Sequence, residues 1–272
     1  MKKTIPQGIK LVLAKALDVT GVLEGSLRKL NKRYHNDYIR VINYHDTVDD
    51  NADSFEAQLK WYKEHYVNTD FNTFKCFIDK RYHFDNKPGL MLTFDDGKRG
   101  NYDCARDLLK KYGFTGYFMC SSDLINTEGY MDKEQILTLV REGHIIGDHT
   151  ATHHRMNEMD EDSVLYYEIS ESKQKLEDIT GEPVEIFCWC GGEEQYYTKR
   201  AYDIIKGSGY RYGFMTNSYP VVSDTDPYHI QRINVEDEWN LSVTKFQVCG
   251  MMDIKLKKKR IRVDNHVLGL DK

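Results

Sequence analysis

Short runs of apolar residues alternate along the chain with longer stretches in which apolar positions recur at three- and four-residue spacing. Glycine, aspartate or polar turn residues bound each run, as is typical of strands. The runs span residues 40–44, 89–94, 116–120, 144–147, 185–189 and 211–215, with a further extended piece at 230–235. This alternation predicts about seven strands, most of them parallel and joined by crossover helices.

The longer stretches predict four helices, at residues 101–112, 133–142, 160–180 and 198–208. A glycine follows near the end of each, at Gly113, Gly143, Gly181 and Gly209, where a helix commonly ends in a left-handed residue. We therefore expect one α/β barrel-like domain over residues 38–272, preceded by an N-terminal helical extension over residues 1–37.

The composition excludes some classes of partner and location. With a net charge of −5 over 272 residues, the chain has no basic field that would attract nucleic acid. No apolar run approaches the roughly 18 residues that a membrane span needs. The six cysteines are scattered through a chain large enough to need no disulfide staples. We interpret them as reduced and expect a cytoplasmic protein.

Two basic segments allow a peripheral role beside a structural one. The N-terminal extension predicts a moderately amphipathic helix with Lys10 and Lys15 among its cations. Docking on the protein's own core is the favoured interpretation, and contact with the inner membrane surface is the alternative. The run KLKKKRIR at residues 255–262 is expected to form a solvated charged face, with a membrane or anionic-substrate role as the alternative.

Candidate chemistry lies at the ends of predicted strands, where barrel enzymes carry their catalytic groups. The first such end is Met91–Gly97, in which a buried-type strand ends in the adjacent carboxylates Asp95 and Asp96. Adjacent residues that leave a strand point in different directions, so one carboxylate can bind a metal while the other faces the substrate. Alone, an Asp-Asp-Gly sequence is also a common turn.

The second strand end carries His149 and His153, with His154 adjacent. A spacing of four is expected to place two imidazoles on one face of a helical turn, as zinc sites require, although an exposed helix can carry such a pair for no reason. Together with Asp96 they form a set of two histidines and one carboxylate. Such a set leaves coordination positions open, which indicates catalysis rather than a structural metal.

The third strand end, Cys188–Gly192, offers backbone N–H groups at Gly191 and Gly192 and an aromatic wall from Trp189. Cys188 and Cys190 are interpreted as small core residues.

The motifs resemble those of the polysaccharide deacetylase family, carbohydrate esterase family 4, and most closely its poly-N-acetylglucosamine deacetylase-like branch. The family's T-F-D-D-G motif corresponds to Thr93–Gly97, and its H-[ST]-x-x-H motif to His149–His153. The resemblance implies an irregular (β/α)7-type barrel. It also implies that Asp95 is the general base that activates water, and that Asp96, His149 and His153 hold a divalent metal, usually Zn²⁺.

The sequence departs from the family at its third motif, R-P-P-Y-G or A-Y-P-Y-G, where this chain has Cys188–Gly192. No arginine is present there to hold Asp95, and Arg232 is our candidate for that task. By the same correspondence, the Gly191 backbone N–H would form part of the oxyanion hole.

The family's late L-x-H histidine, its general acid, has no match, because His266 lies in a different frame. In the poly-N-acetylglucosamine branch the acid follows an early strand that ends in Y-H, which Tyr44 and His45 resemble. We therefore predict His45 as the general acid, with Tyr44 as a substrate contact and Asp46 as a group that could orient the imidazole. A structural His45 bonded to backbone is the alternative.

These expectations describe a metal-dependent hydrolase that removes an N-acetyl group from an amino sugar. The substrate would be a glycan, or a nucleotide- or lipid-linked precursor used in building a surface polysaccharide. Two alternatives remain open from the sequence. One is a catalytically impaired glycan-binding protein on the same fold, and the other is a hydrolase of another acyl or cyclic amide group.

Overall fold

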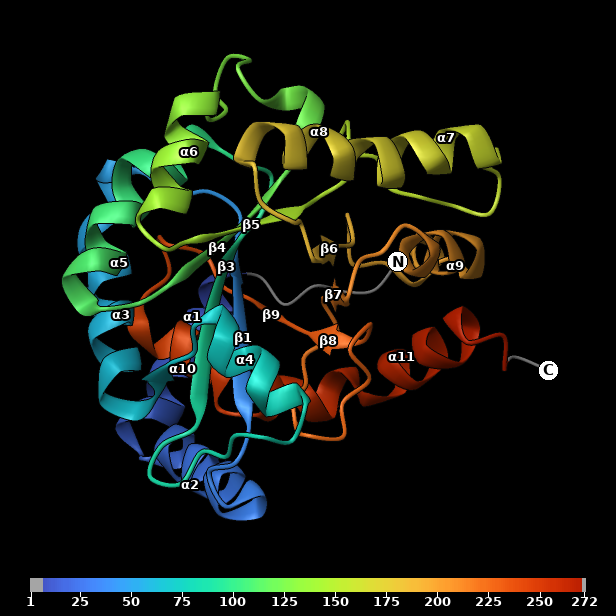
Figure 1. Ribbon diagram of the computed structural model, residues 1–272. Coiled ribbons are helices and arrows are strands. Elements are labelled where there is room, and N and C mark those ends of the chain that lie inside the picture. Colours follow the sequence, from blue (N-terminus) through green and yellow to red (C-terminus); the bar gives the residue numbers. More distant parts are fainter. Residues whose placement is uncertain (1–6, 271–272) are drawn as a thin grey trace.

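A curled parallel sheet forms the centre of the protein, seen in a computed structural model that describes residues 7–270. The described residues contain nine strands in the order β8-β7-β6-β5-β4-β3-β1-β9, with β2 paired to β3 beside this path. Helices surround the sheet, which is bent into a nearly closed barrel (Figure 1). The strands are β1 (Ile39–Tyr44), β2 (Val67–Asn68), β3 (Gly89–Phe94), β4 (Gly116–Cys120), β5 (Ile145–Asp148), β6 (Ile186–Cys188), β7 (Tyr212–Met215), β8 (Ile230–Gln231) and β9 (Ile233–Asn234).

The predicted strands are all present, and the expected irregular barrel is confirmed. β3 and β4 have the predicted bounds, because glycine at one end and a polar turn at the other mark where each strand can begin and end. The short β2 was not predicted. The extended piece at 230–235 was predicted as one strand, but it is divided into β8 and β9 on either side of Arg232.

Each strand has one face toward the barrel interior and one toward the helices. On β3, Met91 belongs to the inner apolar cluster, whereas Leu92 and Phe94 belong to the larger cluster under the helices. Because side chains alternate along a strand, Thr93 and Asp95 share the inward face with Met91. The strand therefore carries an apolar residue deep in the barrel and a carboxylate at its carboxyl end.

The segment at residues 230–235 closes the barrel because it pairs first with one edge strand of the sheet and then with the other. β8 pairs with β7, and β9 pairs with β1, on the other side of the gap. Between them, the Arg232 N–H donates to the Met215 carbonyl at 2.8 Å, and the Val235 N–H donates to the Asn43 carbonyl at 2.8 Å. The side chain of Arg232 therefore begins at the seam of the barrel.

Four predicted helices are present, and two of them contain a π-helical turn. The helix expected at 101–112 begins with the π turn Asn101–Ala105 and continues as α5, and that expected at 160–180 is α7 and α8 joined by the π turn Tyr167–Glu171. The helices are α1 (Gln7–Val19), α2 (Val22–Tyr34), α3 (Ala52–His65), α4 (Phe71–Ile78), α5 (Arg106–Tyr112), α6 (Lys133–Arg141), α7 (Asp162–Tyr166), α8 (Ser172–Thr180), α9 (Lys199–Gly207), α10 (Leu241–Val248) and α11 (Met251–Val267). Single π turns often occur at functional sites, because they redirect one side chain.

The basic run at 255–262 is part of α11, and the expectation of a solvated face is wrong for one of its residues. Lys257 and Lys258 are exposed, but Arg260 is buried and donates to the Asn217 and Ser218 carbonyls at 3.2 and 2.7 Å. At the start of the same helix, the buried Asp253 accepts two hydrogen bonds from Arg40 of β1. The helix packs along the barrel through charged residues, which hydrophobic periodicity does not reveal.

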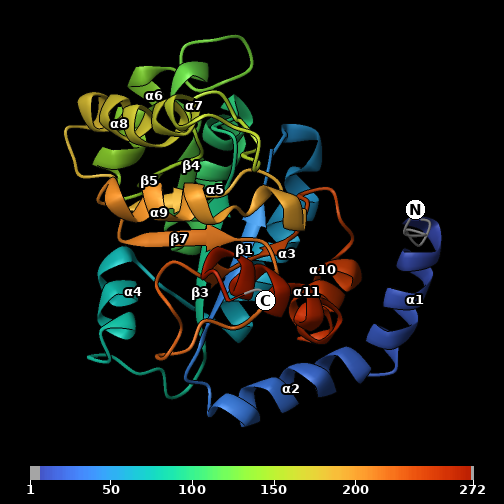
Figure 2. The same cartoon turned by 90° about the vertical axis from the view of Figure 1, so that its right-hand side faces the viewer.

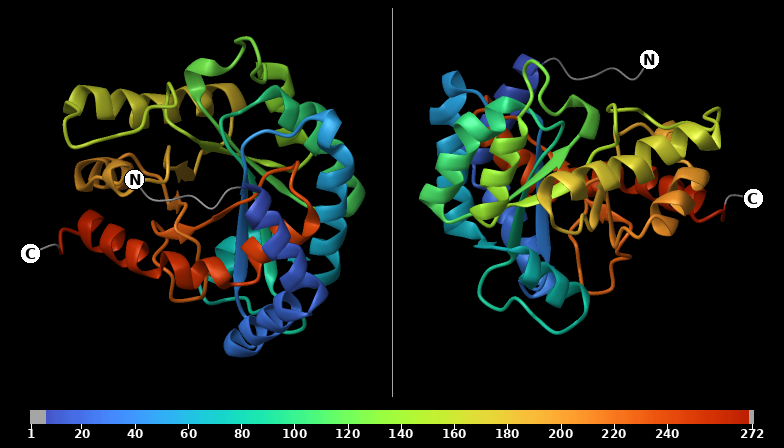
Figure 3. Two further views of the ribbon diagram at one scale, coloured as in Figure 1. Left: turned by 180° about the vertical axis from the view of Figure 1, so that it is seen from behind. Right: turned by 45° about the horizontal axis from the view of Figure 1, so that its top comes forward.

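The N-terminal extension docks on the barrel rather than standing apart from it. Leu23 and Leu27 of α2 are buried in the main apolar cluster, and Asp18 of α1 accepts from Ser242 and Lys245 of α10. Figures 2 and 3 show α1 and α2 on one side of the barrel, beside α10. The first six residues of the predicted extension, including Lys2 and Lys3, lie outside the described residues. Within 7–270, every helix is too short or too polar to cross a membrane.

Candidate metal centre and active site

The carboxyl ends of the strands surround a cavity of about 350 Å³. All the site residues expected from the sequence line it, with the exception of Tyr44. The lining residues are Asn43, His45, Asp95, Asp96, His149, His153, Arg155, Trp189, Gly191, Gly192, Glu193, Thr216, Arg232 and Asn234. The barrel therefore brings together groups that are up to 191 residues apart in the sequence.

Asp95 is held by a two-point ion pair with Arg232 inside the barrel. Nη1 of Arg232 donates to Oδ1 at 2.6 Å, and Nη2 donates to Oδ2 at 2.9 Å. Arg232 is 0% exposed and Asp95 is 2% exposed, so water hardly screens the pair. The guanidinium also donates to Asn43 Oδ1 at 2.9 Å and to Thr93 Oγ1 at 3.1 Å. The geometry fixes the orientation of the Asp95 carboxylate at the floor of the cavity.

The ion pair keeps Asp95 charged. Burial by itself raises the pKa of this carboxyl, but Arg232 and His149 lower it by more, so the pKa of Asp95 lies below its usual value. The group is therefore an anion at neutral pH despite its burial, and it is available to accept a proton.

Asp96 meets the two histidines. Its Oδ1 lies 3.5 Å from Nε2 of His149 and 3.1 Å from Nε2 of His153. The Nδ1 of His149 lies 2.9 Å from the Cys188 carbonyl. Because a carbonyl only accepts, this contact places a proton on Nδ1, so Nε2 is the nitrogen that faces Asp96 and that could bind a metal as a neutral imidazole.

The expected helical turn under the two histidines is wrong. Residues 149–153 form a loop in which Thr150 and His153 have positive φ values of 65° and 62°, and Asp96 has a φ of 69°. The imidazoles still come together, with ring centroids 5.1 Å apart. A left-handed non-glycine backbone is unusual and often marks a functional site, so the loop itself, rather than helical spacing, brings the rings together.

The donor set fits a divalent metal. Oδ1 of Asp96 is buried and accepts no hydrogen bond from any described residue, and two imidazole nitrogens lie beside it. Two other groupings of potential ligands share residues with this one. His149 and His153 lie near the Cys190 thiol, and His149 also lies near Asp95 and the Cys188 thiol. Burial raises the pKa of Cys188 to about 11, so this thiol keeps its proton and is a poor ligand. The set with Asp96 is the one that leaves an unsatisfied anionic oxygen.

His45 lies at the rim, and its partner is not Asp46. Nδ1 of His45 lies 3.6 Å from Oε1 of Glu236, whereas Oδ1 of Asp46 accepts from the Thr47 backbone N–H. The nearby Glu236 carboxylate raises the pKa of His45 above its usual value, against the opposing effect of burial. The imidazole side chain is 42% exposed, so it can reach a bound molecule.

The loop after β6 contributes Gly191, Gly192 and the edge of the Trp189 indole to the cavity. Gly191 has a φ of 76°, and a Cβ there would lie 3.0 Å from the ring of Tyr196, so a side chain would be both strained and crowded. No described residue accepts from the Gly191 N–H, whereas the Gly192 N–H donates to Glu193 at 3.1 Å. Trp189 is 2% exposed and packs on Tyr197, so only a small part of its ring can face the cavity.

Tyr44 does not contact the cavity, which corrects the expectation that it binds substrate. It is fully buried under the helices, and its hydroxyl hydrogen-bonds with Gln58 at 2.6 Å and Tyr62 at 3.0 Å. The two-residue period of β1 places Tyr44 on the outer face and Asn43 on the inner one.

Several residues of the site were missed from the sequence. The strand period could have found Asn43, but Glu236 and Thr216 lie after strand ends with no motif to mark them. Two polar side chains from π turns support the site loops. Asn101 donates to the His45 carbonyl at 3.0 Å, and Glu168 accepts from the Thr152 N–H and hydroxyl at 2.9 and 2.7 Å.

Comparisons with known proteins find similar sequences and similar folds. A family model for polysaccharide deacetylases matches residues 84–213. The chain is 24% identical over 207 residues to the putative polysaccharide deacetylase YxkH of Bacillus subtilis, covering 72% of this chain and 70% of that protein. Among solved structures, it resembles the deacetylase PplD of Streptococcus pyogenes in complex with acetate, at 19% identity and a TM-score of 0.66, covering 78% of this chain and 97% of that one.

IcaB from Ammonifex degensii has a similar fold, at 19% identity and a TM-score of 0.67, again covering 78% of this chain and 97% of that one. The family match includes the strand end with Asp95 and Asp96 and the loop with both histidines. Residues 84–213 thus match the polysaccharide deacetylase family, and the fold around them is that of carbohydrate esterase family 4 deacetylases.

Proposed function

We propose that the protein is a metal-dependent N-deacetylase of amino sugars, with Zn²⁺ held by Asp96, His149 and His153. The observation that carries this proposal is the Asp95 carboxylate, kept anionic by Arg232 and adjacent to the unsatisfied oxygen of Asp96. The match of residues 84–213 to the polysaccharide deacetylase family supports deacetylation. The metal, the amino-sugar substrate and the role of each residue are our proposals.

The cavity residues can be assigned to the proton transfers of amide hydrolysis. When bound, the metal would polarise the acetamido carbonyl and lower the pKa of water to about 7. Asp95 accepts a proton from that water, because its carboxylate is charged and fixed by Arg232. The Gly191 N–H donates to the carbonyl oxygen as negative charge develops there.

Departure of the amine requires a proton, because a free amide anion is a poor leaving group. His45 supplies it from the rim of the cavity, since its raised pKa favours the protonated imidazole. The products are the free amino sugar and acetate. The same geometry argues against a protein that only binds glycans, because binding has no use for a buried charged base beside a metal site.

We infer that the substrate is a glycan, or a nucleotide- or lipid-linked precursor used in surface polysaccharide synthesis at the cytoplasmic side of the membrane. The six free cysteines favour a reducing compartment. On α1, Val12 and Val19 are 70% and 89% exposed, and Lys15 is exposed beside them, which would suit contact with an anionic lipid surface.

The central test of this function is acetate release from N-acetylglucosamine oligomers and nucleotide-linked N-acetyl sugars. We expect the Zn²⁺-loaded wild type to release acetate and Asp95→Asn to lose about 100-fold or more in kcat while retaining metal, because the base is gone. Asp46→Asn, an exposed carboxylate on the same rim, is the matched control and should remain active. Bound metal without turnover on any N-acetyl substrate would favour another acyl group or a binding protein.

The proposed ligand set predicts how metal affinity depends on single residues. Calorimetric titration of Zn²⁺ into the metal-free protein should give one site, and occupancy should raise Tm because the folded state alone holds the ligands together. His153→Ala should weaken binding by more than the roughly 10- to 100-fold that the loss of an outer partner costs. Cys190→Ser should bind like the wild type, whereas a large loss there would indicate the thiol-containing set instead.

The contact between His45 and Glu236 predicts a pH dependence. Glu236 raises the pKa of His45, so the acid form persists to higher pH in the wild type. Glu236→Gln removes that charge, and the alkaline limb of kcat/KM should move to lower pH. The exposed neighbour Glu238 provides the control variant Glu238→Gln, which should leave the profile in place. An unchanged alkaline limb in Glu236→Gln would exclude His45 as the acid.

A further inference from the structure

Three polar residues on one face of α11 contact the loops that form the catalytic cavity. Lys259, Arg262 and His266 are spaced by three and four residues, so they project from the same side of the helix. We call these three residues the clasp. Helix α11 lies after residue 213, where the match to the family model ends.

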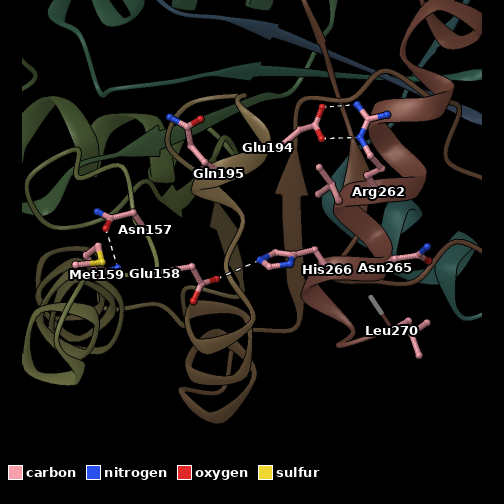
Figure 4. A pocket seen from close by; sticks show the side chains of 10 residues that line it. Asn157, Glu158, Met159, Glu194, Gln195, Arg262, Asn265, His266 and Leu270 are labelled. Atoms are coloured by element: carbon pink, nitrogen blue, oxygen red, sulfur yellow. Dashed lines mark hydrogen bonds and ion pairs between the residues drawn. The ribbon is translucent and has the colours of Figure 1, made fainter. Parts of the chain in front are cut away.

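Two contacts of the clasp act on the loop that carries the third strand end. The ammonium group of Lys259 donates to the Gly192 carbonyl. The guanidinium of Arg262 donates to both oxygens of Glu194, at 2.7 and 2.5 Å. Both residues line a cavity of about 750 Å³. Figure 4 shows their contact.

The third contact acts on the chain that follows the metal-site histidines. Nε2 of His266 lies 3.1 Å from Oε1 of Glu158, five residues after His153, and Figure 4 shows these side chains meeting. The clasp therefore joins the two loops that border the cavity on this side.

The glycine loop has a physical need for such a restraint. Gly191 and Gly192 are consecutive, and glycine loses more conformational freedom on ordering than any other residue. Tyr197 lies below the loop, but its hydroxyl is 3.4 Å from the Gly191 carbonyl, which is a long contact. The charged contact from Lys259 to the Gly192 carbonyl is a stronger type of hydrogen bond.

A contribution to the free energy of unfolding does not explain the ion pairs of the clasp well. The side chains of Arg262 and Glu194 are 56% and 37% exposed, and those of His266 and Glu158 are 44% and 53% exposed. Exposed ion pairs of this kind contribute little to the free energy of unfolding. What they can do is restrict the positions that the two loops sample.

We propose that the clasp on α11 holds the Gly191–Gly192 segment so that the Gly191 N–H keeps its donor geometry, with Lys259 as the main positioning residue. This inference rests on the proposed function for its catalytic consequence.

Lys259→Met tests this proposal, because it removes the ammonium group and keeps an apolar stem. Lys258→Met, at the exposed neighbouring position, is the matched control, and Lys259→Arg is the conservative rescue. The first readout is hydrogen exchange of the amides at residues 190–197, which needs no activity. Lys259→Met should speed their exchange, while Lys258→Met and Lys259→Arg should resemble the wild type.

The second readout is the split between kcat and KM in acetate release. A misplaced donor should lower kcat of Lys259→Met by about 10-fold, with KM, Tm and Zn²⁺ affinity near the wild-type values. Unchanged exchange in Lys259→Met would overturn the clasp. Faster exchange with unchanged kcat in an active enzyme would overturn the positioning role. If the wild type releases no acetate, the proposed function fails, and the exchange experiment still decides whether the clasp exists.

Discussion

The buried ion pair between Arg232 and Asp95 is the interaction on which both the barrel and the site depend. Arg232 lies between β8 and β9, where one extended segment changes its partner from β7 to β1. Removing two charges from water costs several kcal/mol for each ion, so such a pair persists only with good geometry and further hydrogen bonds. Asn43 and Thr93 provide those bonds. The residue that fills the seam of the barrel thus also keeps a carboxylate charged at the floor of the cavity.

Around this fixed point the loops adopt backbone conformations that the fold has to enforce. Left-handed residues such as Asp96 and His153 each cost on the order of 1–3 kcal/mol unless surrounding contacts determine them. The π turns supply some of those contacts through Asn101, which donates to the His45 carbonyl, and Glu168, which accepts from Thr152 beside His153. Helix α11 supplies others from the far end of the sequence. Precise placement of the proposed metal ligands is therefore a property of the whole barrel rather than of the motif alone.

The sequence was informative where chemistry and local structure coincide. The apolar run at β3 with glycine before it and two aspartates after it predicts both a strand and its chemically active end. Contacts between residues far apart in the sequence could not be predicted from local patterns. Glu236, for example, lies near His45 only because the folded barrel brings its last strand beside its first. Spacing also misled, since His149 and His153 meet through a loop and not through a helical turn. The charged run in α11 was interpreted as solvated because a buried arginine looks the same as an exposed one in the sequence.

A double-mutant cycle on the Arg232–Asp95 pair tests the central claim most directly. The free energy of unfolding in urea would be measured for the metal-free wild type, Asp95→Asn, Arg232→Gln and the double variant. Leaving one buried charge without its partner should cost about 3–5 kcal/mol in each single variant. The double variant should lose less than the sum, with a coupling free energy of at least about 1.5 kcal/mol. Additive losses would contradict the account, because they would mean that the barrel closes and Asp95 is placed independently of this pair.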